Sequence, residues 1–248
     1  MLKLYKKSEL GFSLLWIGVY CVSMSVSDNI SADIGIASVI SLPVIVILSL
    51  ILLGFTVKNR LTDKYGLCKA DTPPSKMLFY IPLFVLLTVN LWYNVKLTLS
   101  PIEAVLYILT MLGVGFFEEI LFRGLLFNAM LKDNRTAAIV VSSLTFGLGH
   151  IINLINGSGM NLFENIIQIV SAVAVGFMFV MIYIKSGSLI LCIITHGLFN
   201  ALSVFSDEAL ISPQKRIVSG GFIVILSVAY ALYLAFRIKP EEKENSLE

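Results

Sequence analysis

The sequence has few charged residues and few cysteines. Asp, Glu, Lys and Arg make up 14% of its 248 residues and hydrophobic residues make up 57%, whereas about a quarter of a soluble domain is charged. This composition excludes an ordinary soluble globular protein. The three cysteines, Cys21, Cys68 and Cys192, are far apart and form no CxxC motif, which excludes a disulfide framework and a thiolate metal site. The net charge is only +2 and the basic residues fall in short polar breaks, so no nucleic-acid partner is indicated.

Long apolar runs are the main feature that is present. A membrane-spanning helix needs about 20 mostly apolar residues, and the sequence offers about eight such runs between polar breaks. We therefore expect an all-α protein, a polytopic bundle of transmembrane helices that forms one integral membrane domain over residues 1–248 and resides in the cell membrane. The runs are 10–27, 35–57, 77–97, 102–131, 136–153, 161–184, 187–205 and 219–238.

The positions of lysine and arginine predict the orientation, because these residues accumulate on the cytoplasmic side of a membrane protein. With the N-terminus in the cytoplasm, three basic residues fall on the opposite side, Lys96, Lys215 and Arg216, and fourteen fall on the cytoplasmic side. We therefore predict that both termini are cytoplasmic, which requires an even number of spans. The fourteen are Lys3, Lys6, Lys7, Lys58, Arg60, Lys64, Lys69, Lys76, Lys132, Arg135, Lys185, Arg237, Lys239 and Lys243.

Ionisable residues also occur inside the apolar runs. Glu118, Glu119 and Arg123 lie within the fourth run, and the only two histidines of the sequence, His150 and His196, lie in the fifth and seventh. An ionisable side chain at membrane depth costs at least ~2.5 kcal/mol. Such a group of residues is a functional site by default.

The fourth and fifth runs are expected to form a helical hairpin, because only a short polar turn around Asn134 joins them. Glu118 lies 16 residues before Asn134 and His150 lies 16 residues after it. At about 1.5 Å per residue the two side chains reach the same depth. We therefore expect Glu118 and His150 to face each other.

Residues four apart share a helix face. Glu119 and Arg123 are therefore expected to pair, and His196 and Asn200 are expected to form one polar stripe. Glu118 is turned by about 100° from Glu119 and is expected to stay free. Small residues that allow close helix approach flank these positions: Gly113, Gly115, Gly147, Gly149 and Gly197.

This set of side chains can support hydrolysis with water as the nucleophile. Glu118 and His150 can hold and deprotonate a water molecule, and His196 and Asn200 can donate to the oxyanion of a tetrahedral intermediate. Arg123 would neutralise and orient Glu119. The sequence has no Gly-x-Ser-x-Gly elbow, so a covalent acyl-enzyme is not supported.

The motifs resemble those of one family, the CPBP (Abi) intramembrane proteases, which include CAAX proteases and bacteriocin-processing enzymes. The run from Glu118 to Arg123 is similar to its EExxxR motif, Phe146 to His150 to its FxxxH motif, and His196 to Asn200 to its HxxxN motif. The motifs occur in family order over residues 102–205, which we expect to be the catalytic core. Residues 1–101 and 206–248 would be peripheral spans and tails.

The resemblance implies an intramembrane endopeptidase that acts without a covalent intermediate. It gives Glu118 and His150 the role of activating water, and His196 and Asn200 that of an oxyanion hole. Its substrate would be a membrane-associated peptide or protein, such as a prenylated CAAX protein, a bacteriocin leader peptide or a pro-peptide, and its other partner is the lipid bilayer. The oligomeric state stays open.

The sequence leaves two other functions and the use of a metal cofactor open. A proton-coupled transporter would show repeat symmetry or broken helices in matching halves, and the sequence shows neither. A scaffold, immunity or regulatory protein of the same fold would tolerate loss of the polar groups, all of which are retained. No cofactor is expected; Glu118, His150 and His196 supply at most three ligands, and zinc stays an alternative.

Overall fold

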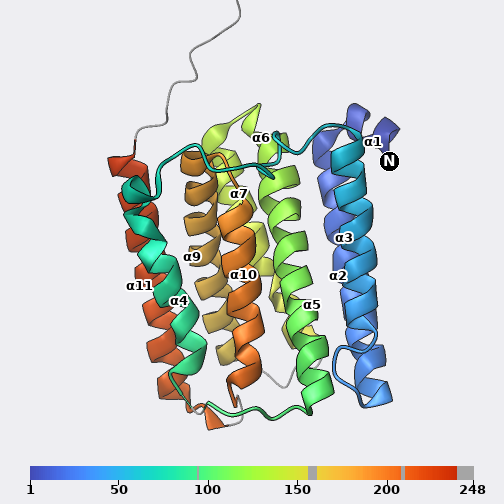
Figure 1. Cartoon of the computed structure of the whole chain (residues 1–248), viewed down its shortest axis with the longest axis vertical. Helices are drawn as coiled ribbons and strands as arrows, with labels where there is room; N and C mark the ends of the chain where they lie inside the picture. The colour runs from blue at the N-terminus through green and yellow to red at the C-terminus, as the bar shows by residue number, and fades with distance from the viewer. Residues whose placement is uncertain (94, 156–160, 208–209, 239–248) are drawn as a thin grey trace, which may run out of the picture.

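The structure is a computed structural model, and it describes residues 1–93, 95–155, 161–207 and 210–238. Within this part of the chain the regular elements are helices, arranged as one bundle (Figure 1). Their bounds are α1 Leu2–Lys7, α2 Glu9–Ile34, α3 Ser41–Lys58, η1 Pro74–Tyr80, α4 Ile81–Thr88, η2 Val89–Leu91, α5 Pro101–Glu119, η3 Ile120–Phe127, α6 Asn128–Leu131, α7 Arg135–Gly149, α8 Ile151–Ile155, α9 Leu162–Ser186, α10 Ile190–Leu202, η4 Ser203–Phe205 and α11 Pro213–Arg237.

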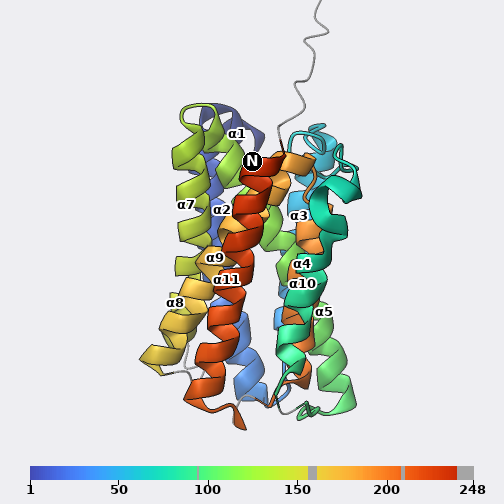
Figure 2. The ribbon, with the colours of Figure 1, turned by 90° about the vertical axis from the view of Figure 1, so that its left-hand side faces the viewer.

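Seven helical units of the described chain are long and apolar enough to cross a membrane, and α10 with η4, Ile190–Phe205, is a shorter eighth. The prediction of an all-α transmembrane bundle with about eight spans is thereby confirmed. The first span is longer than predicted, since α2 has 26 residues, and the seventh is the short one. α1 and the last turn of α11 lie at the same end of the bundle (Figures 1 and 2). Which side of the membrane this end faces stays a prediction.

The third predicted span is not one continuous helix. Leu78, Phe79 and Tyr80 have positive φ angles of 52°, 49° and 59°, a left-handed conformation that side chains rarely adopt. The short helix α4 begins after them, with a proline in its first turn. This irregular segment packs against α10 and α11 (Figure 2), and the Tyr230 hydroxyl of α11 donates to the Met77 carbonyl.

Polar caps at the loop ends start the helices that carry the predicted site. The Ser100 hydroxyl accepts a hydrogen bond from the Glu103 N–H, and the Ser100 N–H donates one to the Glu103 carboxylate, which forms a capping box before Pro101. Asn134 caps α7 by accepting from the Ala137 N–H. These caps satisfy backbone donors that would otherwise lack partners in a low-dielectric environment.

Glycines bring two pairs of helices that surround the site into close contact. A Cβ atom on Gly115 of α5 would lie 2.4 Å from the backbone nitrogen of Gly197 on α10, so both positions must lack a side chain. Gly147 of α7 is equally close to Val173 of α9. Gly149, which was expected to act in the same way, has nothing within 4 Å of its position and is not a contact point.

The long helix from Pro101 to Leu131 contains a π-helical segment, Ile120–Phe127, all eight residues of which are buried. The wider π-helical turn changes the direction of side chains that follow it, and π-helical segments often occur at functional sites. This segment begins directly after Glu119 and contains Arg123. Its residues continue the apolar run, so the sequence alone predicted an ordinary α-helix here.

Candidate active site

A chain of ionic contacts lies inside the bundle, between α5 and α10. Arg123 Nη1 donates to Glu119 Oε1 at 3.0 Å, and His196 Nδ1 lies 2.8 Å from the same oxygen. His196 Nε2 lies 3.6 Å from Glu118 Oε2. The Glu119 and Arg123 side chains are fully buried, whereas that of Glu118 is 14% exposed. His196 therefore lies between two carboxylates, and Glu118 is the one that other molecules can reach.

The guanidinium of Arg123 is held from several directions. Its Nη2 donates to the Gly176 carbonyl at 3.5 Å, and its central carbon lies 4.1 Å from the ring centre of Phe146 and 5.6 Å from that of Phe179. Cation–π contacts of this kind contribute about 2 kcal/mol when desolvated. Arg123 thus fixes Glu119, and through Glu119 it fixes the ring of His196.

Glu118 has a second partner on the first long helix. The Tyr20 hydroxyl donates to Glu118 Oε1 at 2.6 Å, and the Tyr20 ring stacks on Phe117 with ring centres 5.0 Å apart. Tyr20 is buried. This hydrogen bond occupies one carboxylate oxygen and leaves Oε2 directed to His196.

His150 is held by a different kind of contact. Its Nδ1 lies 3.2 Å from the Phe146 carbonyl oxygen, one turn earlier in α7, and its own carbonyl accepts from the Asn165 side chain at 2.9 Å. Because a carbonyl can only accept, Nδ1 carries the proton and Nε2 is left as an acceptor. Glu118 lies close enough to interact electrostatically with His150.

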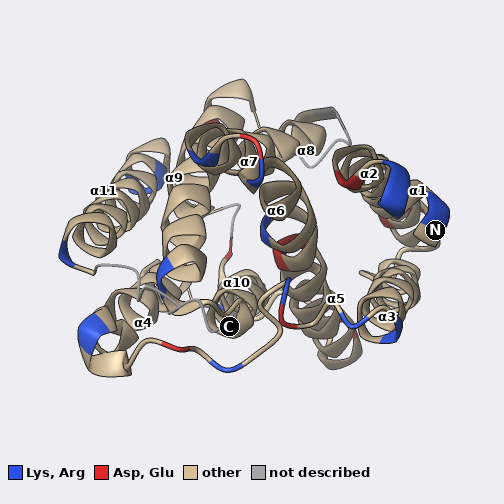
Figure 3. Cartoon of the chain, turned by 90° about the horizontal axis from the view of Figure 1, so that it is seen from above, with Lys and Arg blue, Asp and Glu red and all other residues tan. Residues whose placement is uncertain are grey.

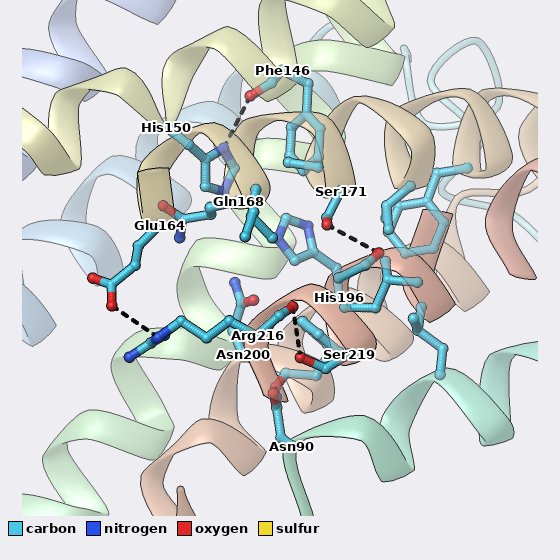
Figure 4. A pocket seen from close by; sticks show the side chains of 18 residues that line it. Asn90, Phe146, His150, Glu164, Gln168, Ser171, His196, Asn200, Arg216 and Ser219 are labelled. Carbon is cyan, nitrogen blue, oxygen red and sulfur yellow. Dashed lines mark hydrogen bonds and ion pairs between the residues drawn. The ribbon is translucent and has the colours of Figure 1, made fainter. Parts of the chain in front are cut away.

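A cavity of about 230 Å³ adjoins the ionic chain. His150, His196 and Asn200 all line it, as do Phe146 and Phe179, and Figure 4 shows the three polar side chains pointing toward the shared space. Its walls combine aromatic and aliphatic side chains with a few polar groups, which is typical of a ligand site. The cavity lies mainly between α9, α10 and α11.

The structure therefore brings the predicted site residues together, with one difference in pairing. Glu119 pairs with Arg123 as predicted. Glu118 was expected to stay free and to face His150, but within the described residues its ionic contact is to His196 and its hydrogen bond is from Tyr20. The reason is the contact between Gly115 and Gly197, which brings the α10 backbone closer to the carboxylates than equal depth alone brings α7.

Sequence reasoning missed three polar residues around the site: Tyr20, Asn165 and Gln168. Tyr20 resembles any interfacial aromatic in the sequence. Asn165 is buried, and Gln168 lines the cavity and accepts a hydrogen bond from Asn153. Both lie inside an apolar run, which is the signal that could have found them, because amides at membrane depth need partners.

The His and Glu side chains of the site are also possible metal ligands. Among the described residues no group of three or more His, Cys, Asp and Glu side chains is arranged to hold a metal ion. His196 Nδ1 and Glu119 Oε1 are already bonded to each other. The expectation that the chain works without a metal or other cofactor stays a prediction.

The segment that carries the candidate active site is also the one that is similar to known proteins. Residues 100–202 match the family model Rce1-like, described as type II CAAX prenyl endopeptidase Rce1-like. No curated protein and no solved structure matches the chain. All six predicted site residues fall inside the matched segment. The resemblance to the CPBP intramembrane proteases is thereby confirmed for residues 100–202, which are similar to the Rce1-like family.

Proposed function

We propose that this integral membrane protein is an intramembrane endopeptidase that hydrolyses a peptide bond of a membrane-associated peptide or protein with an activated water. The observation that carries the proposal is the ionic chain from Arg123 through Glu119 and His196 to Glu118, which meets at His196 a cavity that His150 and Asn200 also line. The family match supports a protease. Residence in the cell membrane is part of the proposal.

Glu118 and His150 are proposed to activate the water. Glu118 Oε2 keeps acceptor capacity, because Tyr20 occupies the other oxygen and His196 Nε2 is 3.6 Å away, beyond a direct hydrogen bond. His150 offers a second acceptor at Nε2 on the cavity side. Two acceptors hold both hydrogens of one water, and transfer of one proton to Glu118 leaves a hydroxide to attack the scissile carbonyl.

His196 and Asn200 are proposed to stabilise the oxyanion. The oxyanion role requires the form of His196 in which both ring nitrogens carry a proton. In that state Nδ1 donates to Glu119 and Nε2 is a donor too. The Asn200 amide provides another donor in the same cavity, and each such donor contributes about 3–4 kcal/mol to transition-state stabilisation. The proton on Glu118 then passes to the leaving amine.

The experiment is a comparison of membrane peptidomes from cells that carry the wild type or Glu118→Gln. We expect the cleavage products of the wild type to be absent in the variant, while the variant protein stays folded in detergent. Glu103→Gln is the matched control, since it removes a carboxylate from the same helix and glutamine preserves a capping box. Addition of EDTA to the purified wild type is expected to leave its activity unchanged.

Identical peptidomes for the wild type and a folded Glu118→Gln protein would refute the assignment. They would instead favour a scaffold or regulatory protein that uses the same cavity to bind a peptide. Loss of activity in EDTA, restored by zinc, would leave the protease in place and contradict the proposed metal-free water activation.

A further inference from the structure

The cavity extends toward one end of the bundle. On α9 it begins at Glu164 in the first turn and ends near Phe179, and on α11 it runs from Arg216 to Ile223 within the first three turns. Asn200 lies in the last turn of α10. These segments all belong to the end of the bundle where α9 and α11 begin, which is opposite to the end that holds α1 (Figures 1 and 2).

The same cavity is closed toward the end that holds the termini. Phe179, Ile182, Cys192 and Leu234 belong to one buried apolar cluster between α9, α10 and α11, each at most 1% exposed. This cluster lies on the α1 side of His196, since Cys192 precedes His196 by one turn of α10. A substrate therefore has no path to His196 from the end that holds the termini through this cluster.

The open end of the cavity has its own polar feature. Arg216 Nε and Glu164 Oε1 lie 3.1 Å apart, with both side chains 17% exposed, and both residues line the cavity. Ser219 and Gln168 lie deeper on the same walls (Figure 4). This end of the cavity is therefore polar, whereas Val175 and Phe199 give the walls farther in an apolar surface.

The basic residues lie mainly at the closed end. Figure 3 views the bundle from that end, with lysine and arginine on the helix ends and loops. Within the described chain, Lys96, Lys215 and Arg216 lie at the cavity end, and the following lie at the other: Lys3, Lys6, Lys7, Lys58, Arg60, Lys64, Lys69, Lys76, Lys132, Arg135, Lys185 and Arg237. Because lysine and arginine mark the cytoplasmic side, the cavity end is the non-cytoplasmic one.

We propose that the cavity receives its substrate from the non-cytoplasmic side of the membrane. This inference rests on the proposed protease function and specifies its substrate class: an exported or translocating polypeptide whose membrane-proximal segment enters past Glu164 and Arg216. An apolar side chain next to the scissile bond can contact Val175, Phe199 and Ile223, which line the cavity. The carboxyl terminus of a cytoplasmic prenylated protein would meet the closed end and does not fit this arrangement.

The test is thiol accessibility in intact cells. The parent protein carries Cys21→Ala and Cys68→Ser and keeps the fully buried Cys192 as its internal blank. Gln214→Cys reports the cavity end and Lys69→Cys the opposite end, since both native side chains are exposed. Ser219→Cys reports the cavity wall. A membrane-impermeant maleimide is applied before and after permeabilisation, and the ratio is taken within each variant so that protein amount cancels.

We expect Gln214→Cys and Ser219→Cys to be labelled equally in intact and permeabilised cells, and Lys69→Cys only after permeabilisation. The reverse pattern for Gln214→Cys and Lys69→Cys would overturn the inference. Labelling of Gln214→Cys from outside with no labelling of Ser219→Cys before permeabilisation would overturn it as well, because the cavity would then be closed to that side. Labelling requires no turnover, so these results are separate from the failure of Glu118→Gln to abolish proteolysis.

Discussion

Replacement of Arg123 by methionine tests whether the ionic chain holds the site together. The Arg123 and Glu119 side chains are 0% exposed and their charged atoms are 3.0 Å apart. Removal of one partner of such a pair leaves the other charge buried and costs about 3–5 kcal/mol. The contacts of Arg123 with Phe146 and Phe179 are lost as well, although methionine refills part of their volume. We therefore expect Arg123→Met to lower the free energy of unfolding by about 3–5 kcal/mol.

The double variant Glu119→Gln/Arg123→Met separates charge from packing. Replacing both partners of a buried pair is often neutral, and a glutamine oxygen can still accept from His196 Nδ1. We expect the double variant to recover most of the lost stability while remaining inactive. Lys64→Met is the matched control, because the Lys64–Glu9 pair is partly exposed, at 31% and 21%, and exposed pairs contribute about 1 kcal/mol or less.

The assay is reversible unfolding in mixed detergent micelles, followed by tryptophan fluorescence, with proteolytic activity measured on the same samples. If Arg123→Met unfolds at the same denaturant concentration as Lys64→Met, the buried pair contributes no more than a surface pair. If the double variant is as unstable as Arg123→Met, the loss comes from packing and not from the uncompensated carboxylate. Either result would refute the reasoning from burial.

Three other variants test the approach of the helices and the chemical roles. Gly115→Ala places a Cβ 2.4 Å from the Gly197 nitrogen and is expected to lower the free energy of unfolding by about 1–3 kcal/mol or more. The matched control is Gly18→Ala, whose Cβ meets nothing within 4 Å. Equal melting temperatures for the two variants would contradict the close approach of α5 and α10. Asn200→Ala should lower kcat by about 100-fold to 1000-fold with little change in KM, and a change confined to KM would argue against the oxyanion role. Tyr20→Phe should lower kcat/KM by about tenfold to a hundredfold, since a hydrogen bond to a carboxylate is worth about 1.5–3 kcal/mol; unchanged kinetics would show that the hydroxyl is dispensable.

The fold was largely predictable because the membrane restricts the options. Backbone groups in lipid must be paired within the chain, so a long apolar run forms a helix, and the run lengths placed eight spans close to their observed positions. The left-handed residues Leu78 to Tyr80 and the π-helical segment Ile120–Phe127 were not predictable. Both depend on how neighbouring helices pack, and the hydropathy of the sequence does not report that packing.

Part of the site was predictable from helix geometry alone. The spacing of Glu119 and Arg123 gave their pairing, since both lie on one helix face. The partner of Glu118 lies on other helices and depends on the distance between helix axes. The sequence marked Gly115 and Gly197 as contact points, yet it did not show that they contact each other, which is what brings His196 rather than His150 against the carboxylates.

His150 and His196 differ in their hydrogen-bond partners, and this difference suits the two side chains to different roles. In the sequence both stand in apolar runs, after a glycine in one case and before a glycine in the other. In the structure the Nδ1 of His150 faces a backbone carbonyl, whereas the Nδ1 of His196 faces the Glu119 carboxylate. The neutral Phe146 carbonyl accepts the Nδ1 proton of His150, so its Nε2 stays an acceptor toward the cavity, whereas the Nδ1 of His196 contacts a carboxylate. In the mechanism proposed above, the first imidazole receives a hydrogen from water and the second binds the oxyanion, although the residue type is the same.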